Sequence, residues 1–141
     1  MDQRESFERR SRDGYTAVAT RFRALLAGDH GATAALYTDD ALLDVNVPAW
    51  RFQHQGADPI RRQLDEWHPF APEIVEWREL TTERGLLVEV ALWEGEGHQL
   101  YCRSQHALEI TSGRISRHTM YCTGDWSKES LAEASAALID A

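Results

Sequence analysis

Three histidines fall in segments that we predict to be β-strands, namely His54, His106 and His118. Imidazole is the side chain best suited to exchange a proton near neutral pH, because its ordinary pKa is about 6.5. A strand that lines a cavity would hold such a group in a fixed position. We therefore expect these histidines to include the group that moves a proton, with a solvent-facing or core hydrogen-bonded histidine as the alternative at each position.

The residue pattern partly predicts which face of its strand each histidine occupies. Alternate residues of segment 100–110 are mostly apolar and include His106, which places His106 on the inner face. A tight turn at Ser112-Gly113 sets His106 opposite Thr119 and puts His118 on the other face. One extra residue in the hairpin, a β-bulge, would return His118 to the inner face. Both histidines remain catalytic candidates.

The elements that must position these side chains follow from apolar periodicity and turn residues. An amphipathic helix runs from Phe7 to Leu25, and a short helix after Asp29 ends before a turn at Asp39-Asp40. The remaining elements are strands at 41–47 and 50–54, a helix opened by Asp58-Pro59, four long strands within 73–123, and a last helix capped by Ser127. This order predicts an α+β fold with helices on one face of an antiparallel sheet and an extra C-terminal helix.

Residues 36–67, LYTDDALLDVNVPAWRFQHQGADPIRRQLDEW, carry a resemblance to a known family. The order of helix end, strand, proline break, aromatic strand and helix resembles the NTF2-like superfamily, which includes SnoaL-like cyclases and ketosteroid-isomerase-like enzymes. The resemblance implies one NTF2-like domain over residues 1–141, in which a strongly curved sheet and N-terminal helices enclose a conical cavity. It also implies a homodimer.

The same resemblance implies roles for Tyr15 and Asp44 and favours His118, whereas the strand pattern favours His106. A tyrosine placed like Tyr15 donates a hydrogen bond to a developing oxyanion in ketosteroid isomerases. Their general-base aspartate lies in the strand that here holds Asp44, but an alignment without gaps puts Val45 at that position. We expect His118 or His106 to move the proton, with Tyr15 and Asp44 assisting.

Aromatic and apolar residues near the expected cavity are candidates for holding a ligand. Trp50, Phe52 and Trp67 flank its mouth and could stack on an aromatic or polycyclic molecule. His54 and Met120 complete the predicted substrate-binding set. A hydrophobic small molecule is the expected partner.

Composition narrows the class of protein. The chain of 141 residues has a formal net charge of −8, which disfavours binding to nucleic acid or to an anionic membrane. No apolar run is long enough to span a bilayer, the N-terminus has no signal-peptide core, and the two cysteines are expected to be free thiols, so we expect a cytosolic protein.

Three functions are compatible with these residues. The preferred one is a cofactor-independent enzyme for cyclisation, dehydration, isomerisation or hydration. The alternatives are a non-catalytic binding protein that uses the same pocket, and a metal or haem protein ligated by histidines from separate strands. Because no metal-ligand spacing such as Cys-x-x-Cys is present, no metal ligands are predicted.

Overall fold

A computed structural model of the protein describes residues 3–140, and among these the side chains of Gln3 and residues 14–140. Phe7, the start of the predicted apolar stripe, lies outside the described side chains. The elements, in chain order, are α1 (Gln3–Leu26), η1 (His30–Ala32), α2 (Thr33–Leu36), β1 (Tyr37–Val47), β2 (Trp50–Gln55), α3 (Ala57–Trp67), β3 (Glu73–Thr81), β4 (Gly85–Glu94), η2 (Glu96–His98), β5 (Leu100–Thr111), β6 (Arg114–Cys122), β7 (Trp126–Ser127) and α4 (Lys128–Ala136).

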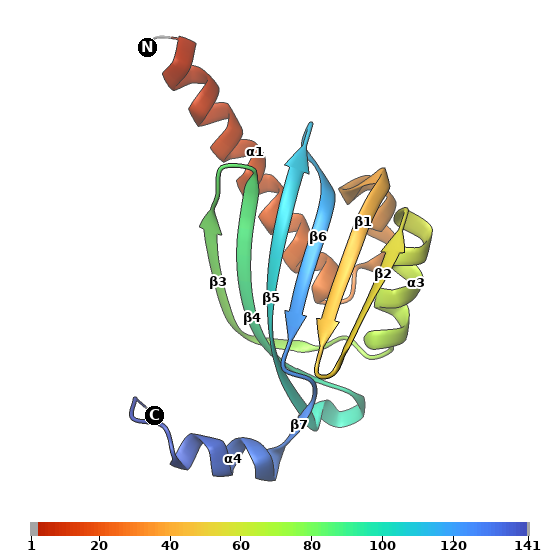
Figure 1. Cartoon of the computed structure of the whole chain (residues 1–141), viewed down its shortest axis with the longest axis vertical. Helices are drawn as coiled ribbons and strands as arrows, with labels where there is room; N and C mark the ends of the chain where they lie inside the picture. Colours follow the sequence, from red (N-terminus) through yellow and green to blue (C-terminus); the bar gives the residue numbers. More distant parts are fainter. Residues whose placement is uncertain (1–2, 141) are drawn as a thin grey trace.

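The strands form one sheet in the order β2-β1-β6-β5-β4-β3, with the short β7 paired to β5 (Figure 1). The α+β prediction is confirmed. The prediction of a wholly antiparallel sheet is wrong at one place, because β1 and β6 run parallel. Tight turns impose antiparallel pairing on β1 with β2 and on β5 with β6, but no turn joins β1 to β6, so their relative direction is free of that constraint.

Two predicted element starts are also corrected. Asp39 and Asp40 lie inside β1, where the register with β6 shifts between Tyr37 and Leu42. This irregularity accommodates two exposed acidic residues that had indicated a turn. Helix α3 begins after Gly56, whose φ of 96° only glycine adopts readily, so Asp58 lies in the first turn of α3 and is not its N-cap.

The concave face of the sheet is covered by α1 and α3 (Figure 1). Val18, Phe22 and Leu25 of α1 are fully buried there, and Ile60 and Leu64 of α3 close the side next to β1. These helices and the inward residues of the strands form one apolar core, so any internal site must lie between α1 and the sheet.

Helix α4 projects away from this body (Figure 1). Ser127 caps it as predicted, its hydroxyl accepting a hydrogen bond from the backbone N–H of Ser130 at 3.1 Å. Helix α4 does not reach the core, since none of its side chains, all of which are described, is buried. None of the helices within residues 3–140 is long and apolar enough to cross a membrane.

The β5–β6 hairpin contains the bulge that decides the histidine positions. Thr111 pairs with Arg114 as predicted, but the register shifts after Ile110 and Ile115. The extra residue is Ser116, whose hydroxyl donates to the carbonyl of Glu109 at 3.2 Å. The strict pairing is therefore wrong beyond the turn: His106 lies opposite Met120, not Thr119, and His118 occupies the inner face with His106.

Candidate active site

Four buried side chains form a continuous hydrogen-bonded chain between the sheet and α1. The hydroxyl of Tyr37 lies 2.8 Å from Nδ1 of His118. Nε2 of His118 lies 2.7 Å from Nδ1 of His106, and Nε2 of His106 lies 2.8 Å from Oγ of Ser104. We call these four residues the histidine relay. All four ring nitrogens are used within it, so a metal or haem could take a histidine only by breaking the relay.

Three strands and one helix position the relay. Tyr37 begins β1, Ser104 and His106 alternate on the inner face of β5, and the bulge turns His118 of β6 inward. His106 and His118 are diagonal neighbours on one face, a spacing that rings can bridge. Phe22 of α1 packs edge-on against both imidazoles, with ring centroids 5.2 Å from each. The relay is therefore rigid and shielded on the helix side.

Burial keeps the relay neutral. Loss of solvation, followed by the electrostatic interaction with His68, lowers the pKa of His106 to about 3. Burial, followed by the repulsion that a second protonated imidazole at His106 would exert, holds the pKa of His118 well below its ordinary value. Burial also raises the pKa of the Tyr37 phenol. At neutral pH both imidazoles are uncharged and the phenol keeps its proton.

The proton direction within the relay follows from the buried phenol. Among the described residues, the Tyr37 hydroxyl has His118 as its side-chain partner, so its proton is satisfied only by donation to Nδ1 of His118. Each neutral imidazole then donates from Nε2: His118 donates to His106, and His106 donates to Oγ of Ser104. The hydroxyl proton of Ser104 is left to point at a ligand.

The relay ends on a cavity of about 170 Å³ enclosed by the sheet, α1 and α3. Its lining residues are Leu26, Val47, Leu64, Trp67, His68, Leu92, Glu94, Cys102, Ser104, His106, His118, Met120, Cys122, Gly124 and Asp125. Apolar side chains make the walls, while polar groups gather in two places. One is the relay end at Ser104. The other is a group of two carboxyls, two thiols and one imidazole, which we call the acid–thiol cluster. Its members are Glu94, Asp125, Cys102, Cys122 and His68.

The acid–thiol cluster has perturbed proton affinities. A hydrogen bond to Glu94, together with burial, raises the pKa of Asp125 to about 7. Burial opposes ionisation of Glu94, but contact with His68 and the hydrogen bond from Asp125 lower its pKa overall. A hydrogen bond from Cys102 lowers the pKa of Cys122 to about 7, whereas the same bond and burial raise that of Cys102.

Two predicted catalytic residues do not join the relay. Asp44 pairs with Thr119 across β1 and β6, so it lies on the face opposite to His118. There its carboxylate accepts two hydrogen bonds from Arg51, at 2.9 and 2.7 Å, and these bonds lower its pKa. Tyr15 is half-buried and packs against the core, and the phenol that reaches the histidines belongs to Tyr37.

The predicted substrate-binding set is divided. Trp67 and Met120 line the cavity. Trp50 is 70% exposed at the tip of the β1–β2 hairpin. Phe52 packs on Trp67 with ring centroids 6.0 Å apart, and His54 bonds to Oε1 of Gln63 at 2.7 Å. Trp50, Phe52 and His54 are thus absent from the cavity lining drawn from the described residues.

Sequence reasoning did not select Tyr37, Ser104 or the acid–thiol cluster as functional. Tyr37 was assigned to the end of a helix, so its alternation with the strand residues after it was hidden. Ser104 was detectable, since it lies two residues before His106 and shares its face. Glu94 and Asp125 lie at strand ends beside glycines, where sequence alone indicates a turn.

Comparisons with known proteins agree with this architecture. The sequence matches no protein-family model and no curated protein. Among solved structures, an NTF-2-like protein of unknown function from Burkholderia xenovorans LB400 is 16% identical, covers 92% of this chain and 98% of its own, and has a TM-score of 0.65. A candidate ketosteroid isomerase from Kribbella flavida DSM 17836 is 20% identical over 82% of each chain, with a TM-score of 0.64.

A third solved structure extends the similarity along almost the whole chain. A phenazine biosynthesis-related protein from Pseudomonas aeruginosa is 12% identical, covers 93% of this chain and 92% of its own, and has a TM-score of 0.62. At these identities the similarity concerns the fold. The protein has the NTF2-like fold, as the sequence predicted.

Proposed function

We propose that the protein is an enzyme that binds a small hydrophobic molecule in its cavity and catalyses a proton-transfer reaction on it. In this proposal no cofactor binds to the histidines. The observation that supports this proposal is the relay from Tyr37 through His118 and His106 to Ser104, which ends with an unused hydroxyl proton on the cavity. Ser104 donates a hydrogen bond through that proton to an oxygen of the ligand, and the bond from His106 to Oγ of Ser104 makes Ser104 a stronger donor.

Neutral donors suit reactions that build negative charge on oxygen. Isomerisation, dehydration and cyclisation of a carbonyl compound all pass through an enolate or alkoxide. A buried hydrogen-bonded chain strengthens the last donor, because each bond polarises the next in a medium of low dielectric constant. The proposed substrate therefore has a carbonyl or hydroxyl oxygen, which would lie against Ser104.

The cavity supports a compact ligand. Its volume of about 170 Å³ is small beside the roughly 300–1,000 Å³ of most ligand pockets. Trp67, Leu64 and Met120 offer apolar contacts, and Trp67 can stack on a flat ring. The named relatives also support small-molecule chemistry, since one is described as a candidate isomerase and another as related to phenazine biosynthesis.

Turnover by relay variants tests the proposal. A panel of small cyclic ketones and hydroxy-ketones is incubated with the purified protein, and products are followed by mass spectrometry and by solvent deuterium uptake. We expect Ser104→Ala and His106→Gln to reduce turnover at least 100-fold, the scale of losing one positioned donor. Asp44→Asn is the control and should turn over normally. Unchanged turnover in both relay variants would refute the proposal.

A non-catalytic binding protein is the second candidate. The supporting observation is that both histidines are held neutral and satisfied by each other. Native mass spectrometry of purified protein separates the two functions. A ligand that is retained and recovered chemically unchanged, with no deuterium exchanged from solvent, would favour binding alone.

We also propose a homodimer formed through the outer face of the sheet. This face carries a hollow of about 400 Å³, beside which Tyr121 is 54% exposed. Ion pairs of Arg78 with Glu89 and Arg103 with Glu76 place both charge signs there, as a self-complementary interface requires. Sedimentation should show a dimer that Tyr121→Asp converts to monomer; a monomeric wild type would exclude it.

We place this activity in the cytosol. Cys102 and Cys122 are both free, although they lie near each other in the acid–thiol cluster. Adjacent thiols stay reduced in a compartment kept reducing by glutathione and thioredoxin.

A further inference from the structure

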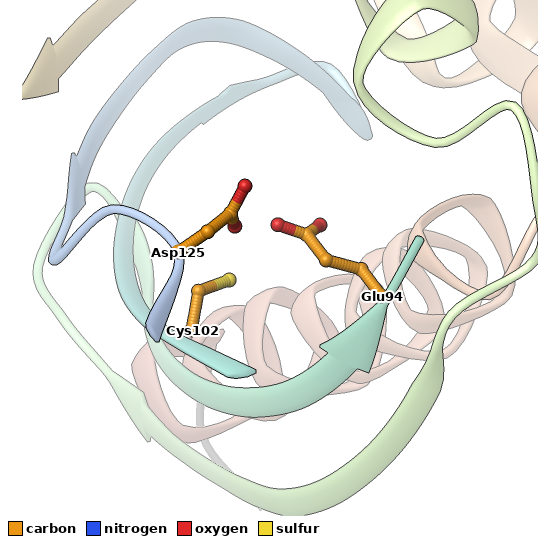
Figure 2. A group of neighbouring side chains, drawn as sticks. All are labelled: Glu94, Cys102 and Asp125. Carbon is orange, nitrogen blue, oxygen red and sulfur yellow. The ribbon is translucent and has the colours of Figure 1, made fainter. Parts of the chain in front are cut away.

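The acid–thiol cluster brings together two kinds of ligand atom, carboxylate oxygen and thiol sulfur, that a borderline-soft metal ion such as zinc accepts. A carboxylate oxygen of Glu94, the Sγ atom of Cys102 and a carboxylate oxygen of Asp125 all lie within 4.8 Å of one another. Figure 2 shows the three side chains converging on one gap from the end of β4, the start of β5 and the segment before β7. The three residues come from three separate segments, so no local sequence motif predicts the cluster.

An independent observation points to a missing partner at this place. His68 is more than nine-tenths buried, lines the same cavity, and has an Nδ1 atom without a hydrogen bond. That Nδ1 lies 3.1 Å from Oε2 of Glu94, close enough for an ion pair but not in the direction of a hydrogen bond. A buried imidazole set against a carboxylate in this way is typical of the groups that surround metal ligands and orient them.

We propose that Glu94, Cys102 and Asp125 bind a zinc ion, and that His68 positions Glu94 through their ion pair. Zinc accepts thiolate sulfur and carboxylate oxygen at about 2.3 and 2.0–2.2 Å. Ligands at these distances in a tetrahedron lie roughly 3.3–3.8 Å apart. Since the three atoms lie within 4.8 Å of one another, the cluster would contract by at most roughly 1–1.5 Å around the ion. Calcium and magnesium are disfavoured, because both take all-oxygen sites.

The charges of the cluster also favour a cation. With the ion bound, the two carboxylates and the Cys102 thiolate would set three negative charges against the two positive charges of zinc. Binding converts the Cys102 thiol to a thiolate and releases its proton to solvent, so each zinc bound exchanges for protons. Three protein ligands leave a fourth coordination position, which a water or an oxygen of the cavity ligand would occupy. The cavity would then have the relay at one place and a Lewis acid at another.

Metal binding by the intact chain tests this site without reference to turnover. Protein stripped with a chelator is titrated with zinc against a chromophoric competitor, and with cobalt(II), whose bond to a thiolate gives a near-ultraviolet charge-transfer band. We expect one zinc per chain and a cobalt band. Cys102→Ser should abolish the band, and Asp125→Asn should weaken zinc binding at least 10-fold. His68→Gln should weaken it 10- to 100-fold, as loss of a ligand-orienting group does.

Two matched variants keep the test specific. Cys122→Ser removes the thiol beside Cys102 and should retain the cobalt band. His98→Gln removes an exposed histidine that bonds to the carbonyl of Ala71, and should retain both the zinc affinity and the band. Asp125 is exposed, so Asp125→Asn leaves the core intact even if Cys102→Ser does not fold. Absence of stoichiometric zinc binding, or a band that survives Cys102→Ser, would overturn the proposal. Loss of the band in Cys122→Ser with retention in Cys102→Ser would do the same.

Discussion

Nε2 of His118 lies 2.7 Å from Nδ1 of His106, and both rings are sealed beneath Phe22. Such a bond needs one donor and one acceptor, so it forms only when at least one imidazole is neutral. Burial ensures that both are, because it lowers both pKa values. The protein thus contains two histidines that act as fixed neutral dipoles and do not titrate near neutral pH.

Stability should fall as the solution is acidified below about pH 6.5. The unfolded histidines take up protons around their ordinary pKa of about 6.5, whereas folded His106 does so only near pH 3. Between these values the unfolded chain binds more protons, so acid favours unfolding by up to roughly 1.4 kcal/mol per pH unit for each histidine. The contribution of the pair is fully present above pH 6.5.

Urea denaturation between pH 8 and 4 measures this dependence. His98→Gln, at an exposed position, should reproduce the wild-type pH profile, and His106→Gln should flatten it. A wild-type stability that stays constant down to pH 4 would show that the histidines are not held neutral.

Tyr37→Phe should destabilise the protein by about 1–3 kcal/mol, because it leaves Nδ1 of His118 buried without its donor. Tyr15→Phe is the matched control, since Tyr15 is half-buried and outside the relay, and should change stability by less than about 0.5 kcal/mol. The comparison is made by chemical denaturation of both variants. Equal effects would mean that the Tyr37 hydroxyl contributes nothing specific.

Asp44→Asn should lower stability by about 1 kcal/mol while leaving the proposed turnover unchanged. Its carboxylate bonds bidentately to Arg51, but the arginine is largely exposed, so solvent screens the pair. Arg51→Gln is expected to have a similar effect on thermal unfolding. A large loss of turnover in Asp44→Asn with normal folding would reinstate this residue as a catalytic group.

Gly85→Ala should be severely destabilising, by more than about 3 kcal/mol. A Cβ at this position would lie 2.0 Å from the backbone oxygen of Leu108 on the neighbouring strand, so β4 and β5 would have to separate. Gly14→Ala on α1 provides the contrast, because no atom lies within 4 Å of its added Cβ and alanine favours a helix by about 1 kcal/mol. Thermal unfolding of the two variants should therefore shift in opposite directions.

Local patterns in the sequence were sufficient to predict most of the helices and strands. Val18, Phe22 and Leu25 recur at helical spacing, and the Ser112-Gly113 dipeptide marks a hairpin. Both elements can be recognised from the sequence, because each depends on residues that are only a few positions apart. The direction of β1 relative to β6 depends on no such pair, and it was predicted incorrectly.

The candidate site was only half predictable for the same reason. His106 could be placed by alternation within its own strand. The position of His118 depends on the bulge at Ser116, and the residues 112–116, SGRIS, contain no pattern that predicts a bulge. Tyr37 meets His118 across 81 positions of sequence, and Glu94 meets Asp125 across 31 positions (125 − 94). Contacts of this kind are set by sheet order and register, which a single sequence does not specify.

Because of the bulge at Ser116, the face of the sheet on which His118 lies depends on the number of residues in the β5–β6 hairpin. Deleting Ser116 would remove the bulge and restore strict pairing, with His118 still opposite Leu108 on the inner face. Deleting one residue beyond a retained bulge would instead turn the imidazole of His118 to the outer surface. Among related chains that keep the histidine, a hairpin without the bulge should therefore be one residue shorter, while substitutions at Ser116 itself are tolerated.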